Sequence, residues 1–378
     1  MLLLNIRRFA FLKKTHHRTE PEVPNVRPTA LPKQLPSLDG FRTVAIAIVF
    51  ASHAGVSHLI PGGFGVTLFF FLSGYLITTL LQREISQTGT LSLPRFFLRR
   101  VVRLWPPLLV TLLVGVFLVT IGLAQGALDW GTLLSQIFFY YNYYSLFAEP
   151  TNSVDGFGIF WSLSVEEHFY LLWPSVFLLL HKRIGASRVL AMILVATLVW
   201  RVVRFVHFQS SEWEIYISTD TRIDALLFGC LLAILQANGA ADRLFKADHI
   251  KWVWLGAAVI LLLLTFAIRE PAFRSTLRYS LQGLALMPVF HYAVTQPDTR
   301  LFKPLNLSWI SQIGVWSYTL YLVHYLIIKA LEYNGLASHG SPALVLGAAA
   351  LSLAYAALMY RIVERPMLPL RRKLAPKG

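Results

Sequence analysis

Long apolar segments recur along the chain from about residue 41 onward, separated by shorter stretches that carry charged, glycine and proline residues. Most approach the roughly 20 apolar residues that a helix needs to cross a bilayer. The pattern predicts about ten transmembrane helices in an all-α, polytopic membrane bundle. A further aromatic segment at 133–147 suits the membrane interface. The predicted spans lie near residues 41–60, 64–81, 104–123, 160–180, 189–207, 221–236, 252–268, 280–295, 312–331 and 342–361.

The composition fits a chain that is surrounded by lipid. Of the 378 residues, 56% are hydrophobic and 14% are charged, whereas about a quarter of a soluble domain is charged. The single cysteine, Cys230, lies in an apolar segment, so one chain can form neither a disulfide framework nor a cysteine-ligated metal cluster. We therefore expect an integral membrane protein.

The formal net charge of +15 is compatible with nucleic-acid binding, but Lys and Arg also crowd the cytoplasmic loops of membrane proteins. With the N-terminus inside, most of the 34 basic residues fall in the inner segments, and the outer segment 124–160 contains none. This asymmetry predicts that both termini are cytoplasmic. It accounts for the charge without a nucleic-acid partner.

The chain divides into three predicted regions. Residues 1–36 are basic and rich in proline, so we expect a flexible cytoplasmic tail. Basic residues interrupt its first apolar stretches, and no cleaved signal peptide is predicted. Residues 37–368 form the predicted membrane domain, and residues 369–378 form a basic cytoplasmic tail. We expect no soluble domain after the last span.

Ionisable residues inside membrane spans are candidates for function, because burying them in lipid costs several kcal/mol unless they are paired or face a cavity. His53 lies about twelve residues into the first predicted span, roughly 18 Å along a helix. Histidine is the commonest general base near neutral pH. The same position would suit a histidine that only bonds two helices together, and the sequence leaves both possibilities open.

Two motifs on the cytoplasmic half of the predicted bundle carry further candidates. Arg100 and Arg103 are three residues apart and share one helix face. Two guanidinium groups on one face suit phosphate, although basic residues at the end of a span also follow from charge asymmetry alone. Ser73 and Gly74 end an aromatic segment, where small residues favour close helix packing over a nucleophilic role for Ser73.

Glu166 and Glu167 lie just inside a tryptophan-rich entry to the span at 160–180. Successive residues of a helix point about 100° apart, so at most one of these carboxylates faces the bundle interior squarely. We favour Glu166, which could orient His53 and stabilise its protonated form.

Other polar positions are interpreted mainly as structural. Arg222 is expected to pair with Asp224, and Asp39 with a cytoplasmic arginine. His324 suits a satisfied core histidine as well as a ligand contact. Intramembrane zinc-protease, ATP-binding and lipase motifs are absent from the sequence. The remaining supporting candidates are Arg42, Trp161 and Tyr318.

Taken in order, several motifs resemble the membrane acyltransferase-3 family from about residue 35 to 368. They are LDGFRTVAIAIVFASH, GVTLFFFLSGYLI, RRVVRLWP, FFYYN, FWSLSVEEHFYLLWP, RIDALLFG, GVWSYTLYLVH and VERP. The resemblance implies a ten-helix domain that moves an acyl group, usually acetyl, from cytoplasmic acyl-CoA to a hydroxyl. Surface polysaccharides and glycolipid precursors are frequent acceptors in that family, and the bacterial inner membrane is the expected location.

The resemblance also implies roles for individual residues. His53 matches the essential histidine, and Arg100 and Arg103 match arginines implicated with CoA. Trp161 and Glu166 belong to the family's Trp-Ser-Leu-x-x-Glu element, which supports Glu166 over its neighbour. Thr67 stands where an acidic or polar residue is usual in the family, so acceptor contacts could differ there. Many members carry an additional helix and an esterase-like domain, which we do not find in this sequence, so we expect any second chemical step to reside elsewhere.

Together these features predict an acyltransferase without a permanently bound cofactor or metal. Acyl-CoA is the donor, a carbohydrate or glycolipid is the acceptor, and lipid is the surrounding partner. CoA is expected to bind at Arg100 and Arg103, while its pantetheine arm carries the thioester toward His53. A multi-span transporter or flippase is the main alternative, because buried His, Glu and Arg also line transport pathways. A polysaccharide-assembly scaffold without activity is a third interpretation.

Overall fold

The structure is a computed structural model that describes residues 35–56, 60–148, 154–181, 185–245 and 248–375. Throughout these ranges the regular elements are helical, and they contain no β-strand. The predicted all-α class is therefore confirmed for the described part of the chain. The predicted N-terminal tail, apart from its last two residues, lies outside that part.

Ten helices of 16 or more residues occur within the described ranges, one at each predicted span. They are α1 (Leu38–His53), α2 (Gly62–Thr88), α3 (Leu93–Thr120), α6 (Trp161–Leu180), α7 (Ala186–Val206), α9 (Thr219–Ala237), α11 (Asp248–Ala267), α13 (Leu277–Thr295), α14 (Ser308–Tyr333) and α15 (Pro342–Met359).

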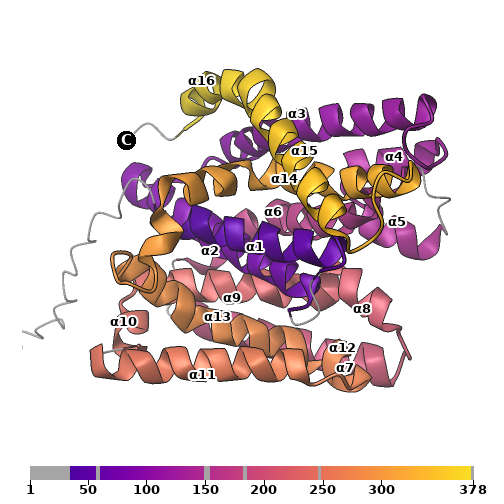
Figure 1. Cartoon of the computed structure of the whole chain (residues 1–378). Coiled ribbons are helices and arrows are strands. Elements are labelled where there is room, and N and C mark those ends of the chain that lie inside the picture. The colour runs from indigo at the N-terminus through magenta and orange to yellow at the C-terminus, as the bar shows by residue number, and fades with distance from the viewer. Residues whose placement is uncertain (1–34, 57–59, 149–153, 182–184, 246–247, 376–378) are drawn as a thin grey trace, which may run out of the picture. The chain divides into compact units, whose positions relative to one another are not determined.

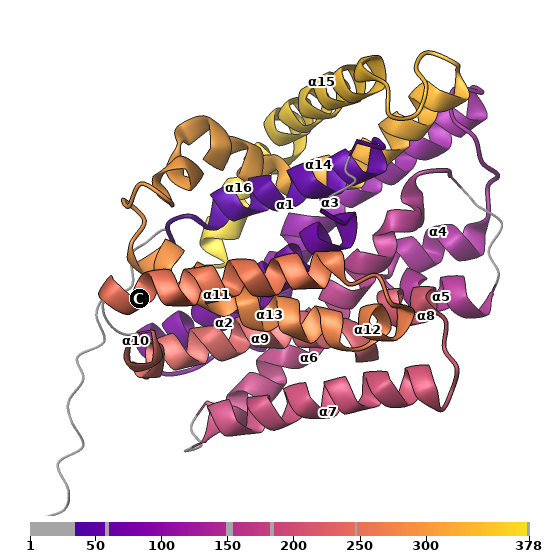
Figure 2. The same cartoon turned by 60° about the horizontal axis from the view of Figure 1, so that its bottom comes forward.

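Shorter elements connect these helices. The aromatic segment at 133–147 forms parts of two of them, α4 and α5. Figures 1 and 2 show α4, α5, α8 and α12 at one end of the bundle and α10 at the other. The short elements are α4 (Trp130–Ile137), α5 (Tyr141–Phe147), η1 (Phe157–Phe160), α8 (Glu212–Ile217), α10 (Ala240–Leu244), α12 (Pro271–Ser275), η2 (Lys303–Asn306), η3 (Tyr360–Glu364) and α16 (Arg365–Lys373).

Within the described ranges, five helical segments are long and apolar enough to cross a membrane by length and composition. On α3, α7 and α11 only 33%, 22% and 17% of the most apolar 18-residue window is buried within the protein. Large apolar side chains on these helices therefore face outward, where lipid would cover them. The chain is an integral membrane protein. The five segments are Gly62–Thr88, Leu93–Thr120, Ala186–Val206, Ile250–Ala267 and Pro342–Lys373.

Glycines allow α2 and α9 to pack backbone against backbone. A Cβ at Gly74 would overlap the carbonyl oxygen of Leu226, and a Cβ at Gly229 would overlap that of Phe71. Close approach of this kind is the usual role of small residues in membrane helices. The packing interpretation of Gly74 is therefore confirmed.

The start of α3 differs from its prediction, which placed the third span at 104–123. Gly89 ends α2 with a φ of 73°, a conformation that glycine adopts without strain. Pro94 then stands in the first turn of α3, where its missing N–H costs no hydrogen bond. Because the helix begins at Leu93, Arg100 and Arg103 project from its body rather than precede it.

Candidate functional site

A cavity of about 340 Å³ lies between α2, α3 and α16, and we call it the arginine cavity. Arg100 and Arg103 line it, and no ion-pair partner within 4 Å occurs for either in the described part of the chain. The basic segment that was predicted as a C-terminal tail continues the helical structure up to Lys373. The five arginines of the cavity are Arg99, Arg100, Arg103, Arg371 and Arg372.

Arg99 differs from its two neighbours because its guanidinium group is already engaged. One Nη donates to Glu84 at 2.6 Å, and the other donates to the carbonyl oxygen of Leu374 at 2.9 Å. Glu84 is buried, and its other carboxylate oxygen accepts from the backbone N–H of Ser92. Arg99 therefore ties α3 to α2 and to the end of α16, whereas neither Arg100 nor Arg103 has a carboxylate partner among the described residues.

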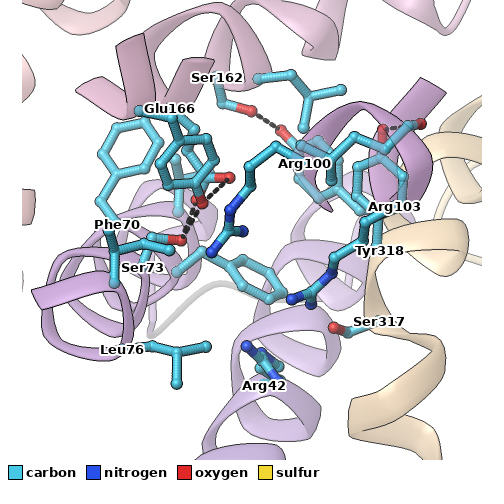
Figure 3. A pocket seen from close by; sticks show the side chains of 17 residues that line it. Arg42, Phe70, Ser73, Leu76, Arg100, Arg103, Ser162, Glu166, Ser317 and Tyr318 are labelled. Carbon is cyan, nitrogen blue, oxygen red and sulfur yellow. Dashed lines mark hydrogen bonds between the residues drawn. The ribbon is translucent and has the colours of Figure 1, made fainter. Parts of the chain in front are cut away.

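A narrower central cavity of about 70 Å³ adjoins the arginine cavity and shares Arg100 and Arg103 with it. Figure 3 shows the guanidinium groups of Arg42, Arg100 and Arg103 pointing toward this space. Arg100 lies over the ring of Tyr170 at 4.6 Å. Arg42 pairs with Asp39 at 2.6 Å, which confirms the predicted pairing of Asp39 with an arginine.

Glu166 lies on the wall of the central cavity, as Figure 3 shows. One carboxylate oxygen accepts a hydrogen bond from the Ser73 hydroxyl at 2.7 Å, and the other accepts from Tyr170 at 3.3 Å. The hydrogen bonds of Glu166 thus join α6 to α2. The prediction that Glu166 orients His53 is wrong, because the Glu166 carboxylate accepts from Ser73 and Tyr170, and no hydrogen bond in the described part of the chain joins it to His53.

His53 instead pairs with His324 of α14, at 2.8 Å between His53 Nδ1 and His324 Nε2. His324 Nδ1 lies 3.0 and 2.9 Å from the carbonyl oxygens of Leu320 and Tyr321. Carbonyl oxygens only accept hydrogen bonds, so His324 Nδ1 carries a proton, and in the neutral ring His324 Nε2 is then the acceptor. His53 Nδ1 is then the donor, and in the neutral ring His53 Nε2 carries a lone pair that no described residue occupies.

The ring of Tyr325 stacks on His53 with centroids 4.4 Å apart. His53 and Tyr325 line a third cavity of about 720 Å³, which we call the histidine cavity. This volume is in the range of small-molecule sites. Its walls are largely aromatic and include Trp161, whose ring centroid lies 4.7 Å from that of Tyr216.

The expected pairing of Arg222 with Asp224 is wrong. Asp224 accepts from Arg201 of α7 at 2.7 Å and from Ser280 at 2.7 Å. Arg222 donates to Thr67 at 3.0 Å and lies 3.9 Å from the ring centre of Tyr279. Residues two apart point to different sides of a helix, so the two side chains of this motif meet different neighbours.

The remaining predicted positions support the cavity walls. Tyr318 donates to the carbonyl oxygen of Leu104, fixing α14 against α3. Tyr321 donates to the carbonyl oxygen of Ile159 and is hydrogen-bonded to Ser162 at 2.6 Å. Because Tyr321 lines both the central and the histidine cavity, this pair stands where the two meet.

Sequence reasoning missed several site residues. Arg371 was assigned to a tail, although its position among three consecutive basic residues after the last span was a signal. Tyr170 lies one helical turn after Glu166, and that spacing could have indicated their contact. Tyr325 follows His324 directly, but its stacking on His53 depends on how α1 and α14 meet, and no pattern in either segment encodes it.

Residues 35–361 match the family of acyltransferase domains known as Acyl_transf_3. The match covers most of the chain, including both histidines, the arginine pair of α3 and Glu166. The chain therefore belongs to this acyltransferase family. This finding favours the acyltransferase interpretation over the transporter.

Named relatives agree with the family match. The peptidoglycan O-acetyltransferase OatA of Listeria monocytogenes is 30% identical over 310 residues, which cover 78% of this chain and 50% of that protein. The O-acetyltransferase OatA of Staphylococcus aureus is 28% identical over 350 residues, covering 89% and 57%. The chain thus spans about half the length of these relatives. No solved structure matches it.

Proposed function

We propose that this protein is a membrane-bound O-acyltransferase of the bacterial inner membrane. It moves an acyl group, which we propose is acetyl, from cytoplasmic acyl-CoA to a hydroxyl of a carbohydrate or glycolipid. The observation that carries the proposal is the row of adjoining cavities. The arginine and central cavities share Arg100 and Arg103, and the central and histidine cavities share Val66 and Tyr321.

The arginine cavity suits the nucleotide part of CoA, because Arg100 and Arg103 have guanidinium groups without a carboxylate partner and such groups bind phosphate well. The central cavity has about one fifth of the volume of the arginine cavity, 70 against 340 Å³. A space of this size is too small for the bulky nucleotide, and we propose that the slender pantetheine arm passes through it. The thioester would then reach the junction at Tyr321, beside the histidine cavity.

His53 is proposed as the general base. Its Nε2 lone pair takes the proton of the acceptor hydroxyl while the hydroxyl oxygen attacks the thioester carbonyl carbon. The carbon–sulfur bond then breaks, and the protonated His53 returns the proton to the CoA thiolate. His324 accepts the hydrogen bond from His53 Nδ1 throughout, so it acts as a positioning residue that fixes the tautomer of the base. The products are an ester and free CoA.

The acceptor is proposed to be a cell-surface polysaccharide or its precursor. Two relatives are named O-acetyltransferases, which supports an O-acetyl product, and the name of one gives peptidoglycan as its acceptor. The aromatic walls of the histidine cavity, with Trp161, Trp213 and Tyr216, suit stacking against sugar rings.

The test is label transfer in membranes that contain the full chain. Radiolabelled acetyl-CoA is added with cell-envelope polysaccharide, and the label that mild base releases from the polysaccharide is counted. We expect base-labile label with the wild type and background label with His53→Ala at equal protein amounts. Equal labelling by the two proteins would overturn the assignment of the base. No labelling and no acetyl-CoA binding by folded wild type would overturn the proposed function.

A further inference from the structure

A fourth cavity, of about 360 Å³, adjoins the histidine cavity and shares Gly63, Trp213 and Tyr216 with it. It lies between the start of α2, α8 and the α12–α13 segment, at the end of the bundle opposite α10 (Figures 1 and 2). Neither the donor path nor the histidine pair uses it. We call it the outer cavity.

The charges of the outer cavity do not cancel. Arg274 pairs with Glu212 at 3.1 Å. Arg278 has no ion-pair partner among the described residues. Its Nε donates to the carbonyl oxygen of Thr265 at 3.3 Å, and its two Nη groups have no hydrogen-bond partner among the described residues. A second cation, Arg222, is fully buried behind the wall and also lacks a carboxylate partner in the described ranges.

Arg278 is 7% exposed, so its charge is largely withdrawn from water. A buried cation without a counter-charge is costly, and an anion that reaches it gains a strong charge-assisted hydrogen bond. The two Nη groups of Arg278 have no described partner, and Arg278 lines the outer cavity. Arg274 already neutralises Glu212, so the carboxylate of Glu212 offers little net repulsion to an entering anion.

The rest of the lining is suited to a sugar. Trp213, Tyr216 and Tyr279 supply aromatic faces, and Gln282 supplies an amide. Aromatic faces beside a small number of polar groups are typical of sites that hold a ring and fix its orientation. Because the two cavities share Trp213 and Tyr216, one saccharide could present a hydroxyl to His53 and an adjacent group to Arg278.

We infer that the outer cavity is a subsite for an anionic group of the acceptor, a carboxylate or a phosphate carried by the sugar next to the acylated one. This inference rests on the proposed function for the role of His53, and it adds a charge preference to the substrate class. The protein would therefore favour acidic saccharides over neutral ones of the same size.

The test compares two disaccharides that differ only in a carboxylate, glucuronosyl-glucose and glucosyl-glucose. Their affinities for the full chain in phosphatidylcholine nanodiscs are measured by calorimetry, with acetyl-CoA binding as a separate readout. We expect the wild type to bind the acidic disaccharide at least about tenfold more tightly. Arg278→Gln is expected to reduce the difference to about twofold, while Arg278→Lys, which keeps the charge, preserves part of it.

Arg269→Gln is the matched control, because Arg269 is exposed at the same end of the bundle and does not line the outer cavity. It should leave the preference intact. Equal affinities in the wild type, no binding of the acidic disaccharide, or an equal loss in Arg269→Gln would each overturn the inference. Acetyl-CoA binding by Arg278→Gln verifies that this variant is folded.

An anionic group could also come from a lipid headgroup, and a second experiment distinguishes this source from a saccharide. Nanodiscs that contain phosphatidylglycerol are analysed for lipid retained by the wild type and by Arg278→Gln. If lipid retention depends on Arg278 and the two disaccharides bind equally, the outer cavity binds a lipid headgroup and not a saccharide.

If the acidic disaccharide binds as expected but acetyl-CoA neither binds nor reacts, the proposed function fails and the anion subsite stands.

Discussion

The arginine cavity and the histidine cavity are built in different ways. The first lies between α2, α3 and α16, and its chemistry comes from fixed positive charges carried by two short stretches, residues 99–103 and 371–372. The second is assembled from α1, α2, α5, α6, α8 and α14, and its chemistry depends on one hydrogen bond between residues 271 positions apart. Binding of a charged donor needs only an approximate array of cations, whereas proton transfer needs one ring nitrogen held in one orientation.

This difference predicts that substitutions in the histidine cavity affect turnover, while those in the arginine cavity affect donor affinity. The largest effect is expected for His53→Ala, which removes the proposed base. Positioned general bases contribute about 10²- to 10⁴-fold, so kcat should fall by at least about a hundredfold. Acetyl-CoA affinity, measured by calorimetry, should change by less than about twofold. A loss of affinity equal to the loss of turnover would erase the distinction between the two cavities.

His324→Phe should have the next largest effect. Phenylalanine keeps an aromatic ring at this position but offers no hydrogen-bond acceptor to His53 Nδ1, so the tautomer of His53 is no longer fixed. We expect kcat to fall by roughly tenfold to a hundredfold. His324→Gln, whose side-chain oxygen can still accept, should recover part of the activity. If both variants are equally impaired at equal thermal stability, His324 is needed for packing alone.

The double variant Arg100→Ala/Arg103→Ala tests the other cavity. Its dissociation constant for acetyl-CoA should rise tenfold or more, at least about 1.4 kcal/mol. The turnover of donor-saturated protein should change much less than in His53→Ala. Arg95→Ala is the matched control, because Arg95 is exposed on the same helix and lines neither cavity. Unchanged acetyl-CoA affinity in the double variant would show that the donor does not bind in this cavity.

Of the four test variants, Glu166→Gln should have the smallest effect. Glutamine can keep hydrogen bonds to Ser73 and Tyr170, and Glu166 does not contact His53, so kcat should fall by less than about threefold. The rate is measured at saturating acetyl-CoA beside Ser73→Ala, which removes one partner of the carboxylate. A loss as large as that of His53→Ala would show that Glu166 acts on the base after all.

Several features of the site could be predicted from local sequence. Arg100 and Arg103 share a face because three residues make nearly one helical turn, and this spacing does not depend on any other helix. Asp39 and Arg42 meet for the same reason. The approximate position of each long helix also followed from its apolar length, since lipid leaves the backbone few alternatives to a helix, although α3 begins at Leu93 and not near residue 104.

The partners of the buried ionisable residues could not be predicted in this way. His53 was assigned to Glu166 and Asp224 to Arg222, but the structure pairs them with His324 and Arg201.

What the sequence alone determined is therefore the set of helices, their apolar surfaces and the charges that share a helical turn, because these depend on distances along one chain. The tertiary structure decided which side chains meet across helices. Such contacts depend on the rotation and depth of each helix against its neighbours, and close packing at positions such as Gly74 and Gly229 sets both. The histidine pair and the outer cavity are products of that packing.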